Sequence, residues 1–424
     1  MQEPETSFSE NGNNPDRIRL LPLLLYFILA VPMYFTIDGA VEIGGFGLMY
    51  HYLYGIGIIA IGFFFYLFTG YQKRCLWILK WAAVLSLSYL VPLAYSCLIW
   101  SFRFSPSDYI TKGLFYNVYM LIGILVSGMT FYLFGDLAVP VSVAAMATAN
   151  TMIMIPVAME NPAEFLQELV TLVVSFGNET GPMVKSIEIH DLTFAFGVYL
   201  LYALIRKDCP MRWYVIGASL FFSLTGLKRI AFMGIAAGYV VCRLFQKMPE
   251  KKAKRMAFSL CGIVVLASYV YIIAVHNGLF DILEDTFHIH TLGRNLIYRQ
   301  LNTLFSFSPF FLGNGIGFSG HAWDGMTGRK VIHDAFHNEY IRMYIEIGFW
   351  GYIMWWLTNI FARLSYGFRK EGKDGGLYLL AMILYLYCTY SSDNTYYYYY
   401  TSMALFLLCM CGRGNYAENQ EKQR

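Results

Sequence analysis

A short polar segment, HDAFHN at residues 333–338, contains the side chains best suited to chemistry in this sequence. His333 and His337 have the i, i+4 spacing that places two imidazoles on one helical face, and with Asp334 the pattern resembles the zinc-binding HExxH motif. The aspartate is a methylene shorter than glutamate and no third ligand stands at a suitable spacing, so we expect no metal. His337 alone could instead be a base or hydrogen-bond acceptor for a hydroxyl, because imidazole titrates near neutral pH. A purely structural histidine is the third interpretation.

The polar segment leads without a helix breaker into an apolar, tryptophan-rich stretch that ends at Trp356. The whole chain has the same character, because 57% of its 424 residues are hydrophobic, 14% are charged and the mean hydropathy is +0.47. This composition predicts an integral membrane protein with the lipid bilayer around it. The 31 Lys and Arg residues are scattered between apolar runs, so we expect no nucleic-acid partner.

The apolar runs predict an all-α polytopic membrane protein, since about 20 residues cross the hydrocarbon core as a helix, and about 12 such helices fit the chain. The predicted spans are residues 20–37, 46–69, 76–100, 113–134, 137–159, 192–205, 213–224, 230–245, 256–275, 341–362, 377–391 and 396–411. Spans seven and eight could instead be one long kinked helix. We expect a cytoplasmic tail at 1–19, a single membrane domain at 20–411 and a second cytoplasmic tail at 412–424.

Basic residues in short connections give the orientation, because loops rich in Lys and Arg stay on the cytoplasmic side. Such residues fall in alternate connections, at Lys73-Arg74, Arg206-Lys207, 251–255 and Arg369-Lys370. Both termini are therefore expected in the cytoplasm, and the long segments 160–191 and 276–340 outside it. The first of these contains EFLQELVTLVVSF, whose apolar spacing predicts a helix lying on the membrane. We expect the second, which includes HDAFHN, to fold as a membrane-hugging cap.

Cations on the predicted outer side break this orientation rule and could bind an anion. Lys228 and Arg229 separate two apolar runs, where a charge either faces a polar cavity or snorkels to lipid phosphates. Arg294 and Arg299 lie close together in the second outer segment, and either guanidinium could hold a diphosphate in a bidentate fork. For Arg299, a solvated loop charge is an equal alternative.

Three glycines at positions 313, 315 and 317, in SPFFLGNGIGF, predict a tight turn that brings the cap back onto the membrane. They follow no strand of a βαβ unit and open no GK[ST] helix, which argues against a nucleotide site. Their backbone amides could still face a ligand.

Four stretches, in this order, resemble the superfamily of O-antigen ligases and Wzy-type O-antigen polymerases: TGLKRIAF, GRNLIYRQ, SPFFLGNGIG and HNEYIRMYIEIGFWG. The resemblance covers about residues 225–394. It implies a metal-independent glycosyltransferase of the C type (GT-C) that uses undecaprenyl-diphosphate-linked glycans as donor and acceptor, with no cofactor. It also implies the bacterial cytoplasmic membrane, a site on its outer face, and a chain-length regulator and a flippase as further partners.

The resemblance assigns roles to individual residues. Arg229 and Arg294 would hold the lipid diphosphate, and His337, followed by Asn338, would assist attack by the acceptor hydroxyl. We expect a supporting role for Asn338.

Further residues match the family in part. Asp393, in SSDNT, corresponds to a polar pair near the outer end of a late helix, and His333 and Asp334 would be supporting polar residues. Lys228 and Ile230 stand where the family has small residues, a departure that makes Arg229 less secure than His337.

The most direct functional interpretation is a polymerase that joins repeat units into O-antigen or capsular polysaccharide, because the aromatic-rich early helices resemble those of the diverse polymerases. A ligase that transfers glycan to lipid A core or another acceptor shares these parts and is the alternative. A lipid-linked glycan transporter is an alternative of another class. It predicts intramembrane charges in repeated halves, and the sequence has no visible internal repeat.

Overall fold

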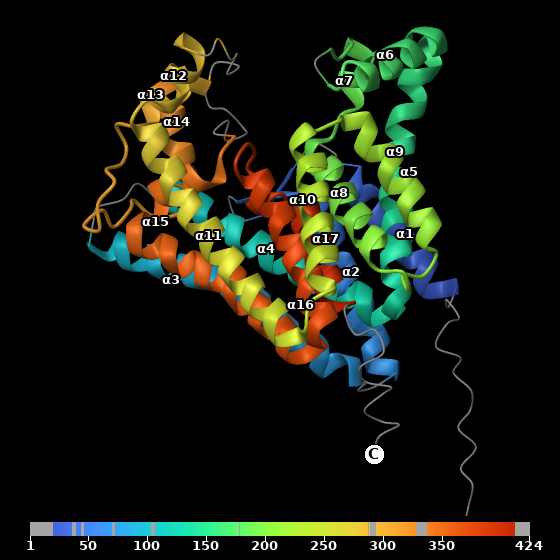
Figure 1. The fold of residues 1–424 in the computed structure, drawn as a ribbon. Coiled ribbons are helices and arrows are strands. Elements are labelled where there is room, and N and C mark those ends of the chain that lie inside the picture. Colours follow the sequence, from blue (N-terminus) through green and yellow to red (C-terminus); the bar gives the residue numbers. More distant parts are fainter. Residues whose placement is uncertain are drawn as a thin grey trace, which may run out of the picture.

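The computed structural model of the chain describes residues 20–35, 40–43, 46–69, 73–102, 107–177, 179–286, 288, 294–327 and 337–411. Most of these residues are helical (Figure 1), as the sequence predicted. The predicted tails at 1–19 and 412–424 lie outside the described residues, and so do His333 and Asp334.

The elements of the first half are α1 (Leu20–Tyr34), β1 (Ala40–Ile43), β2 (Phe46–Met49), α2 (Tyr50–Thr69), α3 (Lys73–Phe102), α4 (Ser107–Phe134), the 3₁₀ turn η1 (Gly135–Leu137), α5 (Ala138–Glu160), α6 (Pro162–Val174), α7 (Pro182–Ile187) and α8 (His190–Ile205). Those of the second half are α9 (Arg212–Gly226), α10 (Arg229–Gln246), α11 (Glu250–His276), α12 (Leu279–Asp285), α13 (Arg294–Leu301), α14 (Phe318–Thr327), α15 (Glu339–Trp356), the π-helix η2 (Leu357–Ala362), α16 (Arg363–Tyr390), the 3₁₀ turn η3 (Thr395–Tyr397) and α17 (Tyr399–Met410).

Helices occupy each of the twelve predicted spans, and several are suited to a membrane. Five stretches are long and apolar enough to cross one by length and composition: Tyr50–Phe68, Arg74–Phe102, Ile110–Glu160, Arg229–Gln246 and Glu250–His276. The chain is therefore an integral membrane protein built from helices.

The interpretation of spans seven and eight as one kinked helix is wrong, because α9 and α10 are separate helices. The chain leaves helical geometry at Leu227 (φ 18°, ψ 66°) and Lys228 (φ −82°, ψ 103°). Gly226 ends α9 where it lies against α8, since a Cβ at this position would stand 2.1 Å from Thr193 Oγ1.

The predicted span 46–69 begins too early, because its first residues form a strand. β1 and β2 pair antiparallel, with Ala40 opposite Met49 and Ile43 opposite Phe46, and α2 starts only at Tyr50. The sequence between the strands is Gly44-Gly45, a dipeptide that two-residue hairpin loops favour.

The region after residue 338 also differs from prediction. The expected loop at 363–376 is helical, because α15, η2 and α16 follow one another without a gap from Glu339 to Tyr390. Two glycines break this run instead: Gly348 (φ 59°, ψ −167°) inside α15 and Gly372 (φ 69°, ψ −158°) inside α16. The expectation of an unbroken helix entering the membrane from HDAFHN is therefore wrong at Gly348.

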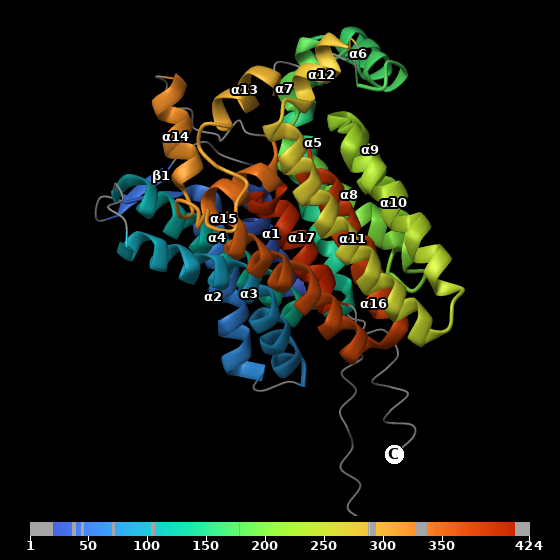
Figure 2. The same cartoon turned by 60° about the vertical axis from the view of Figure 1, so that its left-hand side comes forward.

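The two segments predicted to lie outside share one end of the molecule. Figures 1 and 2 place α6 and α7 at the same end as α12 and α13. The basic connection between α10 and α11 and the bend of α16 lie at the opposite end, where Lys373 Nζ donates to Gln246 O over 2.6 Å. The stretch predicted as a surface helix in the first segment is indeed helical, as α6.

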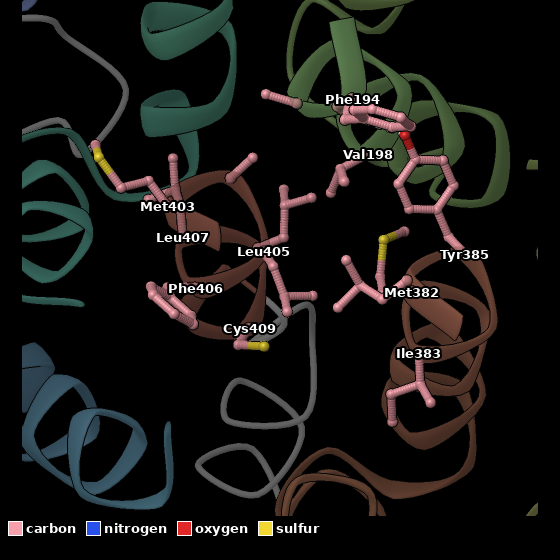
Figure 3. Packing of buried hydrophobic residues seen from close by; sticks show 14 of the residues in the cluster. Phe194, Val198, Met382, Ile383, Tyr385, Met403, Leu405, Phe406, Leu407 and Cys409 are labelled. Carbon is pink, nitrogen blue, oxygen red and sulfur yellow. Dashed lines mark hydrogen bonds between the residues drawn. The ribbon is translucent and has the colours of Figure 1, made fainter. Parts of the chain in front are cut away.

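The packed centre of the fold is α17, which is buried along its length and packs against α4 and α8. Figure 3 shows Leu405 of α17 facing Met382 of α16, with Val198 of α8 close by. Across the same region Tyr385 of α16 donates a hydrogen bond to the Phe194 carbonyl of α8, over 2.8 Å (Figure 3). This core fixes the ends of α8, α16 and α17, which carry polar residues of the site described below.

The glycine segment 311–317 fills the break in α15. The break frees carbonyls that an unbroken helix would use, and Gly315 N donates to Glu346 O over 2.7 Å while Phe349 N donates to Phe311 O over 2.9 Å. Gly313 and Gly348 allow this approach, because a Cβ on Gly313 would stand 2.5 Å from Gly348 N. The predicted tight turn is therefore present, and it brings this segment back onto α15.

The amides of this segment are used inside the protein. Asn314 N donates to Glu346 O, Ile316 N to Ser96 Oγ and Gly317 N to Glu346 Oε1, at 3.0 to 3.1 Å. Together with Gly315 N, these amides have partners within the protein, so the expectation that they face a ligand is wrong.

Gly348→Ala should strongly destabilise the protein. A Cβ there would stand 2.3 Å from both Leu312 C and Phe311 O, and the backbone conformation is one that residues with side chains rarely adopt, so we expect a loss of about 3 kcal/mol or more. The melting temperature in detergent and the yield of monodisperse protein would measure it.

Gly262→Ala is the matched control, because Gly262 lies within α11 and a Cβ there meets nothing within 4 Å. It should be neutral or stabilise by up to about 1 kcal/mol, since alanine has the higher helix propensity. Equal effects of the two substitutions would show that the break in α15 is not required.

Candidate functional site

His337 lies at the entrance to α15, in a conformation that is unusual for a residue with a side chain. Its φ is 46°, in the left-handed region, and such strain concentrates at functional sites. The imidazole is 46% exposed, and its Nδ1 lies 3.9 Å from Asp393 Oδ1. This distance is too long for a direct hydrogen bond but short enough for a charge on either group to influence the other.

Asn338, the next residue, is buried and caps α15. Its Oδ1 accepts from Ile341 N at 3.1 Å, and its Nδ2 donates to Tyr271 Oη of α11 at 2.8 Å. Its Nδ2 also donates to Ser391 O at 3.1 Å, and its backbone N donates to Asn394 Oδ1 at 3.2 Å. Asn338 therefore positions His337 by joining α15, α11 and the connection between α16 and α17.

Asp393 lies on that connection and is buried beside His337. Its Oδ1 accepts hydrogen bonds from Tyr398 Oη at 2.5 Å and from Asn394 N at 2.9 Å. Burial raises the pKa of the Asp393 carboxyl, but the interactions with His337, Tyr398 and the Asn394 amide outweigh burial and hold the pKa below its ordinary value. Asp393 is thus a carboxylate at neutral pH.

A second polar cluster, Glu188, His190 and Lys228, was not predicted as a unit. Lys228 Nζ lies 2.6 Å from Glu188 Oε1 and 3.4 Å from His190 Nε2, and that nitrogen lies 3.3 Å from Glu188 Oε1. The sequence signalled Lys228 as a cation out of place. It gave no sign of the two partners, which come from the junction of α7 and α8 about forty positions earlier.

The two clusters are neighbours. Burial lowers the pKa of His190; Lys228 and His337 act in the same direction, while Glu188 and Asp393 oppose them. Asp191, next to His190, connects α8 to the start of α17, because its carboxylate accepts from Tyr400 N and Thr401 N at 2.8 Å each.

Four helices begin at this site: α8, α10, α15 and α17. Asn338 caps α15 and Asp191 accepts from the first turn of α17, whereas Ile189 and Lys228, the N-cap residues of α8 and α10, make no side-chain capping hydrogen bond. Helix N-termini carry partial positive charge and free N–H groups. The site therefore favours an anion near the starts of α8 and α10.

The arginines predicted to bind a diphosphate lie in different places. Arg229 is the first residue of α10, adjacent to Lys228, and is exposed. Arg294 begins α13, but its side chain is outside the described residues. Arg299, also on α13, pairs with Asp281 of α12, its Nε and Nη2 lying 2.9 and 2.8 Å from Asp281 Oδ1. The structure thus brings His337, Asn338 and Asp393 together, and the contacts of Arg299 are to α12.

Within the part of the chain that the structure describes, no group of three His, Cys, Asp or Glu side chains is arranged to hold a metal ion. The HDAFH zinc motif falls mostly outside that part, since only His337 of the five residues is described.

A comparison with models of protein families gives a match over the second half of the chain. Residues 213–356, about a third of the chain, match the family model described as O-antigen ligase, which confirms the resemblance noted in the sequence. Members of this family are glycosyltransferase-like membrane enzymes. The matched range includes Lys228 and His337 but ends before Asp393 and begins after His190. No curated protein and no solved structure matches the chain.

Asp191 should make the stability of the site depend on pH. Burial raises its pKa from 3.8 to about 6, so the folded protein holds this proton more tightly than the unfolded chain does. The stabilisation from that proton, about 3 kcal/mol, is complete below pH 3.8 and is lost as the pH rises through about 6. The melting temperature of the wild type relative to Asp191→Asn should therefore increase between about pH 8 and about pH 5. A difference that stays constant over this range would contradict the assignment.

Proposed function

We propose that this chain, which carries the O-antigen ligase family region at residues 213–356, is a glycan polymerase of the bacterial cytoplasmic membrane. It joins undecaprenyl-diphosphate-linked repeat units on the outer face of that membrane, into O-antigen or capsular polysaccharide. The observation that carries the proposal is His337, held in a strained conformation beside the Asp393 carboxylate and near the polar cluster of Glu188, His190 and Lys228, where four helices begin.

His337 assists the acceptor hydroxyl. Because Nδ1 faces Asp393, Nε2 is the nitrogen available to accept a proton, and the carboxylate stabilises the imidazolium that results. The half-exposed ring is accessible to a sugar hydroxyl. Proton transfer to a positioned histidine contributes about 10² to 10⁴ in rate.

The leaving group is the lipid diphosphate. The acceptor oxygen forms a bond to the anomeric carbon of the donor glycan, the bond from that carbon to the phosphate oxygen breaks, and the hydroxyl proton passes to His337. Negative charge develops on the departing diphosphate, and cations and helix N-termini aimed at it stabilise that charge. Lys228 and Arg229 at the start of α10 are suited to this role, and Arg294 and Arg299 on α13 are the further candidates.

The membrane arrangement that fits this chemistry is a single GT-C-like domain of about twelve spans, with both termini in the cytoplasm. Two features support it. Both long segments share the end of the molecule at which the site lies, and basic connections lie at the other end (Figure 2). The segment containing α12, α13 and α14 would wall a wet cavity for the growing glycan, while the polyprenyl chain stays in lipid. A flippase that supplies the substrate and a chain-length regulator are the expected partners.

Reconstitution of the purified protein with lipid-linked repeat units, without nucleotide sugar or added metal, tests the proposal. Lengthening of glycan on the lipid, seen as a ladder on a gel, is the expected result. Transfer only to lipid A core would select a ligase. Movement of unaltered substrate across the bilayer would select a transporter, and either outcome would contradict the polymerase assignment.

His337→Ala should reduce the rate of elongation about 10² to 10⁴ fold in a protein that remains folded, because no imidazole is then present to take the proton of the attacking sugar hydroxyl. His288→Ala is the matched control, since His288 is an exposed histidine of the same segment that also has positive φ (52°). Elongation rates on lipid-linked substrate, with melting temperatures to verify folding, measure both variants. A folded His337→Ala protein with full activity would remove His337 from the mechanism.

A further inference from the structure

The contacts of Lys228 differ from those of a cation in a purely structural ion pair. Its side chain is 24% exposed, and its ammonium lies between a carboxylate, Glu188 at 2.6 Å, and an imidazole, His190 at 3.4 Å. Glu188 is more enclosed at 14%, and His190 is more open at 48%. The cluster is therefore closed on the glutamate side and open on the histidine side, toward which a ligand can approach.

Two helix starts surround the same cluster. Lys228 is the N-cap of α10, an 18-residue helix, and His190 is the first residue of α8, and neither helix has a side-chain cap. Their first amides are donors suited to an anion. Glu188 is the one carboxylate of the cluster, and it lies beside these two helix starts.

We infer that Lys228 binds the diphosphate of the lipid-linked donor. Glu188 forms an ion pair with Lys228 until the diphosphate displaces the glutamate. The inference rests on the proposed function and deepens it. Lys228 stands where the sequence departs from the family, so this role belongs to the residue that the resemblance left unexplained.

Replacement of Glu188 by the diphosphate is favourable because the diphosphate interacts more strongly with the Lys228 ammonium. A diphosphate presents more negative charge and more acceptor oxygens than one carboxylate, and a partly exposed ion pair is weak enough to open. When the phosphate enters, Glu188 is released next to it and repels it, while His190 can turn an N–H toward either anion. Glu188 thus competes with the substrate for the cation.

Opposite effects of two substitutions test this competition. With full-length protein in phosphatidylcholine nanodiscs, we expect Lys228→Met to weaken binding of undecaprenyl diphosphate about tenfold or more, and Lys228→Arg to keep most of the affinity. Glu188→Gln should tighten binding several-fold, because it removes the competing charge. Lys185→Met, which removes an exposed cation from nearby α7, should leave binding unchanged.

A merely structural ion pair predicts something else. Both Lys228→Met and Glu188→Gln would then weaken binding of undecaprenyl diphosphate, since each removes the same ion pair. This result would overturn the inference. Unchanged binding by a folded Lys228→Met protein would overturn it too, while leaving the proposed function intact if the wild type still elongates glycan. Failure of the wild type to bind undecaprenyl diphosphate would overturn the inference, whereas failure to elongate glycan would overturn the proposed function.

Phospholipid headgroups are another source of phosphate. In nanodiscs that contain phosphatidylglycerol, the wild type should still bind undecaprenyl diphosphate more tightly than Lys228→Met does. Loss of that difference would show that Lys228 binds bulk headgroups, and it would overturn the assignment to the donor.

Discussion

The capping of α15 by Asn338 is the interaction on which the site depends. A buried amide without partners costs several kcal/mol in an apolar environment, and this one is satisfied only if α15, α11 and the connection between α16 and α17 meet at one point. Once they meet, His337 has to turn through a left-handed conformation to enter the helix. That turn places its ring beside Asp393, which the same connection carries.

A second constraint of the same kind anchors the segment that contains α12, α13 and α14 to this helix. The break at Gly348 exposes carbonyls of α15, and the glycine segment 311–317 supplies the amides that satisfy them. Glu346, two residues before the break, accepts from Gly317 N and Ser319 Oγ and is thereby held in the interior. Backbone hydrogen bonds therefore couple this segment to α15, the helix that begins at the site, and they place the wall of the proposed cavity relative to His337.

Hydropathy alone predicted where helices occur, because a long apolar run in lipid has to satisfy its backbone internally. It could not predict the break in α15, since Gly348 and Gly351 look alike in sequence. Only the structure shows that Gly348 has a positive φ and packs against Phe311 and Leu312. The strand at 46–49 was missed because its residues are as apolar as those of a span, although the Gly-Gly before it was a usable signal.

Some residues of the candidate site could likewise be identified from the sequence, and others could not. The resemblance named His337, Asn338 and Asp393 one by one. In the structure His337 Nδ1 lies 3.9 Å from Asp393 Oδ1, and Asn338 N donates to Asn394, the residue after Asp393. Glu188 and His190 could not be found, because their link to Lys228 is a tertiary contact between elements far apart in sequence. The Asp281 partner of Arg299 was missed for the same reason.

The central claim is that a diphosphate binds where α8 and α10 begin, within reach of His337. A structure of the protein in a lipid nanodisc with undecaprenyl diphosphate measures this most directly, through the position of the two phosphates. The account predicts phosphate oxygens in contact with Lys228 Nζ and with the first amides of α8 or α10, with Glu188 displaced. Phosphates bound instead against α13, away from Lys228 and His337, would contradict it.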